Sequence, residues 1–287
     1  MRLKTMRIEA LALPLVTLIA LAACSSGSQR AAADSWSPRW QETERLFIDG
    51  DIDGTLQQVE VLLNAGDSHA VRAAAWKMLI LAGKSRGYFE LSEAYETGAQ
   101  ENRAELSAFR RAASTYRSRA RLASLALAQM AADTDRHFGH VDTIPLNVPM
   151  PPGSTSPSPV VASVEVGRLA HQTQLTAAEE YTVRRAIVLT VCEAGKATSD
   201  RKDPDAGECL AAHSPAIPKP RLLAVVGRVL YEQADLFAES RLNDPDKYAL
   251  LLNLSERLLE TSLLYQQRQK AGLELWQAEL RNRRSLP

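Results

Sequence analysis

Few of the residues that mark specialised protein classes occur in this chain of 287 residues. Three cysteines are too few for a scaffold built on disulfides, and neither sign of charge dominates, because there are 34 basic and 34 acidic residues. The net charge therefore gives no reason to expect nucleic acid or an anionic bilayer as a partner. Hydrophobic residues make up 45% and charged residues 24% of the chain, which is typical of a globular protein rather than of a disordered one.

The apolar segment near the N-terminus is too short to cross a bilayer as a helix. It covers residues 10–23, about 14 residues, whereas a spanning helix needs roughly 20. The basic residues Arg2, Lys4 and Arg7 precede it, and small residues end it. Because positive charge, an apolar segment and small residues in this order are typical of an export signal, we expect residues 1–23 to be a signal peptide.

The end of this segment, Leu21-Ala22-Ala23-Cys24, resembles the processing site of bacterial lipoproteins. The resemblance implies that the leader is cut before Cys24 and that fatty acids such as palmitate are attached to this cysteine. Several acyl chains hold a protein firmly on a membrane, whereas one does so weakly. Ser25 follows the cysteine in place of an aspartate. In enteric-type sorting this implies a lipid-anchored protein of the outer membrane, facing the periplasm or the cell surface, with residues 24–35 as a flexible tether.

Once Cys24 is assigned to the lipid, Cys192 and Cys209 remain as a pair. In an oxidising compartment such a pair is expected to form a disulfide, which would stabilise the fold by about 3 kcal/mol. Two free buried thiols are the alternative. A zinc site is disfavoured because no CxxC sequence and no suitably spaced histidine accompany the two cysteines.

Hydrophobic spacing predicts an all-α fold, with short antiparallel helices over residues 36–135. Glycines are expected to end these helices, at Gly50, Gly66, Gly83 and Gly98. The sequence from Gly50 to Leu56 is similar to the turn between the helices of tetratricopeptide repeats. The resemblance covers about one repeat and implies a TPR-like α-solenoid.

The longest helix of this region is expected to begin at a capping box formed by Asn102 and Glu105. Its apolar residues recur with heptad spacing, which predicts an antiparallel seam: Leu106, Phe109, Ala113, Tyr116, Ala120, Ala123, Leu127 and Met130. Arginines cover the remainder of the helix: Arg103, Arg110, Arg111, Arg117, Arg119 and Arg121. They form either a solvated face or a strip that contacts an acidic partner or the phosphates of lipid head groups.

Residues 136–162 are rich in proline and are expected to form a linker, because proline prevents a long helix there. A C-terminal helical domain is expected over residues 163–287. Thr176 and Glu179 predict a capping box at its first helix. Two later helices, joined at residues 243–245, are expected to form a long antiparallel hairpin.

The turn near Gly50 also matches a calcium-binding loop. Four carboxylates occupy positions one, three, five and twelve of the pattern: Asp49, Asp51, Asp53 and Glu60. The repeat turn explains the same residues without a metal, and no second loop is present to pair with this one. His137 and His140, near Asp135 and Asp142, are a second metal-binding alternative.

No motif of an enzyme stands out, since the chain has no Gly-x-Ser-x-Gly sequence, no His-Glu-x-x-His sequence and no phosphate-binding glycine loop. We therefore expect no enzyme and no cofactor other than the covalent lipid. The predicted function is that of a lipid-anchored interaction or scaffold module of the cell envelope with an envelope protein as partner and no nucleic acid. A calcium-binding module and a cell-wall hydrolase are the alternatives.

Overall fold

The computed structural model describes residues 38–65, 68–139, 141–145, 175–195, 216–265 and 277–283. These residues form helices and only one small sheet of two strands, so the prediction of an all-α fold is confirmed. The predicted signal peptide, Cys24, the tether and most of the proline-rich linker lie outside the described residues.

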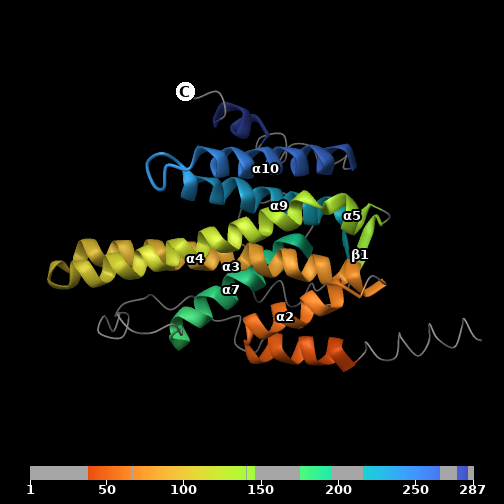
Figure 1. Ribbon diagram of the computed structural model, residues 1–287, viewed down its shortest axis with the longest axis horizontal. Coiled ribbons are helices and arrows are strands. Elements are labelled where there is room, and N and C mark those ends of the chain that lie inside the picture. Colours follow the sequence, from red (N-terminus) through yellow and green to blue (C-terminus); the bar gives the residue numbers. More distant parts are fainter. Residues whose placement is uncertain are drawn as a thin grey trace, which may run out of the picture.

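Figure 1 shows the helices stacked in layers, with α3 in the middle of the stack. The described elements are, in chain order, a helix over 38–49, α2 (Ile52–Leu63), α3 (Ser68–Glu101), η1 (Arg103–Glu105), α4 (Leu106–Ala132), α5 (Thr134–Phe138), β1 (Thr143–Pro145), α7 (Ala177–Gly195), β2 (Ala216–Pro218), α9 (Lys219–Ala234), η2 (Asp235–Phe237), α10 (Pro245–Tyr265) and a helix over 277–283.

The central helix, α3, contacts α2, α4, α7 and α9. Its first half is apolar on nearly every side, because residues 73–76 and 78–82 are all buried. A helix that is hydrophobic all round is a buried helix, and the neighbours of α3 cover it from several directions. This helix therefore organises the core.

The prediction that Gly83 ends one helix and that another ends at Gly98 is wrong, because α3 runs through both residues for 34 residues without a break. Glycine inside a helix costs only about 1 kcal/mol, and packing against several neighbours outweighs this cost. The glycines instead allow close approach. A Cβ atom at Gly83 would lie 2.2 Å from Ile187 Cα of α7, and one at Gly87 would lie 2.7 Å from Val183 Cα. One long helix replaces two short ones, and the TPR-like repeat arrangement is not confirmed.

The predicted seam of α4 is confirmed, because Phe109, Tyr116 and Leu127 are buried and α4 packs along α3 as an antiparallel hairpin (Figure 1). Aromatic rings stack across this seam, with ring centroids of Tyr95 and Tyr116 5.4 Å apart. The capping box expected at Asn102 and Glu105 is wrong, since neither side chain caps a helix. A 3-10 turn, η1, separates these residues from α4 instead.

Both predictions for the C-terminal helices are confirmed. The Thr176 and Glu179 capping box is complete: the Thr176 N–H donates to Glu179 Oε2 at 2.7 Å, and the Glu179 N–H donates to Thr176 Oγ1 at 3.3 Å. The helices α9 and α10 form the predicted hairpin, and Asn243 in their turn has a φ of 54°. The helix over 277–283 lies against this hairpin, with Leu280 fully buried.

The described parts of the two predicted domains share one hydrophobic core, which extends from Trp40 to Leu280. The strand pair is a second connection between the two predicted domains. β1 lies within the predicted linker, and β2 directly precedes α9 of the C-terminal domain. Ile144 pairs with Ile217 in antiparallel register. No helix among the described residues is long and apolar enough to span a bilayer.

Candidate functional site

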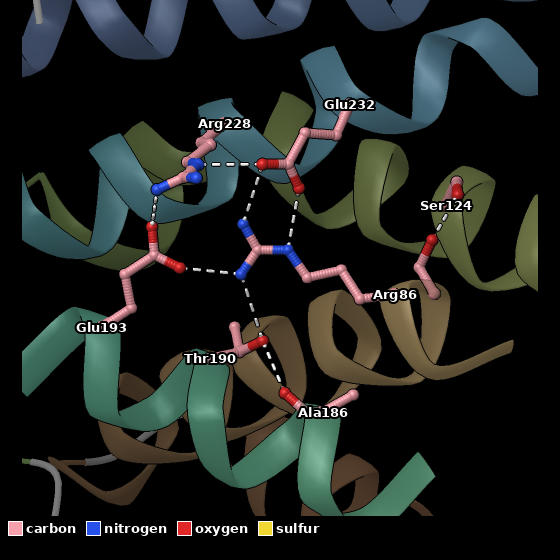
Figure 2. Close-up of polar contacts among 8 residues, drawn as sticks. Arg86, Ser124, Ala186, Thr190, Glu193, Arg228 and Glu232 are labelled. Atoms are coloured by element: carbon pink, nitrogen blue, oxygen red, sulfur yellow. Dashed lines mark hydrogen bonds and ion pairs between the residues drawn. The ribbon is translucent and has the colours of Figure 1, made fainter. Parts of the chain in front are cut away.

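The most extensive group of interacting charged side chains in the described core joins α3, α7 and α9 (Figure 2). Arg86 of α3 lies at its centre, Glu193 comes from α7, and Arg228 and Glu232 come from α9. We call these four residues the Arg86 network. Their side chains are between 20% and 42% exposed, so the network lies at the edge of the core rather than on the open surface.

The geometry of the network places each carboxylate between two guanidinium groups. Arg86 Nε and Nη2 donate to the two oxygens of Glu232 at 2.9 and 3.2 Å, and Arg86 Nη1 donates to Glu193 Oε2 at 2.7 Å. Arg228 closes the ring, with Nη1 2.8 Å from Glu193 Oε1 and Nε 2.8 Å from Glu232 Oε1. Thr190 supports Arg86 by accepting a hydrogen bond from Nη1 at 3.4 Å.

Charge balance explains why these groups are tolerated at the edge of the core. Burial disfavours the Arg86 cation, but the neighbouring Glu232 and Glu193 outweigh burial and raise the pKa of Arg86 above its ordinary value. Two cations and two anions alternate around the ring, so the network is neutral as a whole. Bidentate arginine–carboxylate contacts such as that between Arg86 and Glu232 also fix orientation.

The arrangement suits helix attachment better than catalysis. Every oxygen of Glu193 and Glu232 accepts from a guanidinium group, so neither carboxylate is placed to exchange a proton with a substrate. A cell-wall hydrolase would need one carboxyl group that can donate a proton. We interpret the network as the polar clamp that sets α7 and α9 against α3.

A second polar group forms around the start of α7. Glu179 is only 2% exposed, and Tyr95 Oη donates to its Oε1 at 2.5 Å. Burial, and then the contact with Glu179, raises the pKa of Tyr95 and of Tyr116 above the ordinary value of tyrosine. The carboxylate that caps α7 is thus also bonded to α3, which fixes the start of α7 on the α3–α4 hairpin.

The helix over 38–49 is attached to α3 by an aromatic group. Trp40 Nε1 donates to His69 Nδ1 at 2.8 Å, and the ring of Trp40 lies 5.5 Å from that of Trp76. The guanidinium carbon of Arg72 lies 4.0 Å from the centroid of the Trp40 ring, and its Nη2 is 2.7 Å from Glu44 Oε1. The first described helix after the predicted tether is therefore firmly packed on the core.

The four carboxylates of the predicted calcium loop do not converge. Asp49 accepts from Arg45 at 2.7 Å, Asp53 accepts from Lys84 at 2.6 Å, and Glu60 pairs with Lys77. Asp51 accepts from the backbone N–H of Gly54 at 2.9 Å and so caps α2. No group of three or more His, Cys, Asp or Glu residues that could hold a metal ion occurs in the part of the chain that the structure describes.

The remaining candidate residues are only partly within the described chain. Cys192 is 1% exposed on α7, but Cys209 lies outside the described residues, so a disulfide between them stays a prediction. His137 is described, and burial lowers its pKa, whereas His140 is not described. The second metal-binding alternative is therefore untested.

Five of the six arginines of the α4 region divide into two groups. Arg117 and Arg121 turn toward the core, where Arg117 lies 3.4 Å from Glu96 and Arg121 donates to the Leu236 carbonyl at 3.0 Å. Arg103, Arg110 and Arg111 are exposed. The arginines are therefore only in part a solvated face, which is one of the two alternatives that the sequence leaves open.

Sequence reasoning missed the Arg86 network. The spacing of Arg228 and Glu232, four residues apart on a helix, is a local sign of an ion pair. Nothing local joins them to Arg86, whose carboxylate partners lie 107 and 146 residues further along the chain.

Comparison with known proteins gives no relative from which a function could be transferred: no family model, no curated protein and no solved structure matches this chain.

Proposed function

We propose that the protein is a lipid-anchored component of the cell envelope that acts without catalysis, as an interaction or scaffold module. The observation that carries the proposal is the sequence Leu21-Ala22-Ala23-Cys24 after a basic and apolar leader. Only 13 residues separate Cys24 from the helix over 38–49, which begins at Pro38 and is packed on the core through Trp40. A short connection of this kind suits a folded body held next to a membrane.

The location supports two further parts of the proposal. An oxidising envelope compartment favours a disulfide between Cys192 and Cys209, which would close the segment between α7 and β2. The outer membrane, facing the periplasm or the cell surface, is the proposed site of attachment. The partner is proposed to be another envelope protein, because stacked helices offer extended surfaces for binding other chains.

Replacing Cys24 with serine tests the anchor. We expect Cys24→Ser to abolish incorporation of radiolabelled palmitate and to move the protein from the membrane to the soluble fraction, or to stall its maturation, because serine has no sulfur to acylate. The matched control is Ser26→Ala, two residues further on, which should leave both labelling and fractionation unchanged. An unaltered protein that never takes up palmitate would refute the anchor and, with it, the proposed location.

The calcium-binding alternative has a separate test. We expect calcium to leave the melting temperature unchanged, because Asp49, Asp53 and Glu60 pair with basic side chains and Asp51 caps α2. Thermal unfolding with calcium or with a chelator measures this. A calcium-dependent rise in melting temperature that disappears in Asp51→Ala would instead establish the calcium site.

A further inference from the structure

We infer that the exposed basic face of α4 rests on the anionic head groups of phospholipids and so orients the anchored protein on its membrane. This inference deepens the proposed function and depends on it, because the anchor brings the face to the bilayer. The net charge of the chain is zero and predicts no such contact. The inference rests instead on the distribution of charged residues along α4.

The composition of α4 is one-sided. Its 27 residues include arginines at 110, 111, 117, 119 and 121 but no aspartate and no glutamate. The nearby acids of α3 are largely matched within the fold: Glu93 lies 3.1 Å from Arg241, Glu96 lies 3.4 Å from Arg117, and Glu90 lies 3.2 Å from Arg185. Glu101 and Glu105 are exposed at the turn, before the first residue of α4.

One face of α4 gathers exposed basic, hydroxyl and apolar side chains and no acidic one. At 100° per residue, the following exposed residues fall within about a third of the helix circumference: Ser107, Arg110, Arg111, Ser114, Ser118 and Leu122. Arg103 in η1 precedes them. Within the described chain, Arg103, Arg110 and Arg111 form no ion pair and no hydrogen bond through their side chains, so their guanidinium groups are available to a ligand.

The position of the face leaves it open to a flat surface. Figure 1 shows the turn end of the α3–α4 hairpin projecting past the ends of α7 and of the α9–α10 hairpin. Tight packing makes this projection stiff, since a Cβ atom at Gly98 would lie 2.4 Å from the ring of Phe109. A stiff, projecting helix can lie along a bilayer over several turns.

The chemistry of the face favours phospholipid over an acidic protein. Guanidinium and hydroxyl groups donate hydrogen bonds to phosphate, and arginine does so in a bidentate manner. Leu122 is 69% exposed at the end of the stripe and adds an apolar group that can contact lipid. The exposed stripe contains no aromatic residue, the type that most often anchors a protein–protein interface.

The test uses the full mature chain carrying Cys24→Ser, so that acylation cannot cause binding. We expect it to sediment with vesicles of phosphatidylglycerol and phosphatidylcholine but not with phosphatidylcholine alone, and to be released by high salt. Replacing Arg103, Arg110 and Arg111 together by glutamine should lower the partition coefficient about 100-fold. The matched control replaces Arg39, Arg136 and Arg281, also exposed, by glutamine and should bind as the parent does.

Circular dichroism and thermal unfolding of both triple variants show whether each remains folded. An equal loss of binding in the two variants, or no preference for phosphatidylglycerol in the parent, would overturn the inference. Binding of the parent to polyglutamate but not to vesicles would also overturn it and would indicate an acidic protein partner. If the unaltered protein incorporates palmitate but the Cys24→Ser chain ignores anionic vesicles, the inference fails while the proposed anchor stands.

Discussion

Gly83→Ala is expected to lower the free energy of unfolding by about 2–3 kcal/mol, although the same change in an uncrowded helix would raise it by about 0.5–1 kcal/mol. The new methyl group would lie 2.2 Å from the Cα atom of Ile187 and 2.7 Å from its backbone nitrogen. Backbone atoms cannot rotate away as the end of a side chain can. The methyl group would therefore push α7 away from α3 and disturb the contacts on both sides of it.

Denaturant unfolding monitored by circular dichroism measures this change. Gly195→Ala is the matched control, because nothing lies within 4 Å of a Cβ atom at that position on α7. It should alter stability by less than about 0.5 kcal/mol. If Gly83→Ala stabilised the protein, the close approach of α3 and α7 would be wrong.

Arg86→Ala is expected to destabilise the fold by about 3 kcal/mol. The substitution leaves Glu193 and Glu232 facing each other at the edge of the core with Arg228 as the remaining partner from the network. Removing one member of a buried ion pair costs about 3–5 kcal/mol, and the partial exposure of these carboxylates places the expected loss at the lower end.

Two comparisons separate the network from a surface effect. Arg45→Ala removes an arginine that also bridges two carboxylates, Glu42 and Asp49, but does so in solvent, and it should have little effect. A double-mutant cycle between Arg86→Ala and Glu232→Gln should give a coupling free energy of at least about 1 kcal/mol. Additive effects would show that the two residues act independently.

Features that depend on neighbours in the sequence could be predicted, and features that depend on distant neighbours could not. Thr176 and Glu179 of the capping box lie three residues apart, and the apolar seam of α4 repeats along a single helix. Both features can therefore be predicted from the sequence. The prediction for Gly83 is wrong because the local sequence does not distinguish a glycine that ends a helix from a glycine that allows a second helix to pack closely. The contact with Ile187, about a hundred residues later, decides between the two.

The candidate site shows the same limit. Asp49, Asp51, Asp53 and Glu60 have the spacing of a metal loop, but α2 begins at Ile52 and turns the later carboxylates toward lysines of α3. The partners Lys77 and Lys84 belong to another helix, so no local pattern could reveal them. The Arg86 network could not be predicted for a similar reason, because its members come from three helices that are distant in the sequence.

The central position of α3 has a consequence for the order in which the chain becomes stable during synthesis and export. α3 is complete at residue 101, but the helices that cover Gly83 and Arg86 end at residues 195 and 234. A chain is synthesised from its N-terminus. The apolar surface of the α3–α4 hairpin therefore stays exposed to solvent until more than a hundred further residues have been added. Contacts between such distant segments form slowly, and the hairpin is the surface that a holding chaperone would meet first.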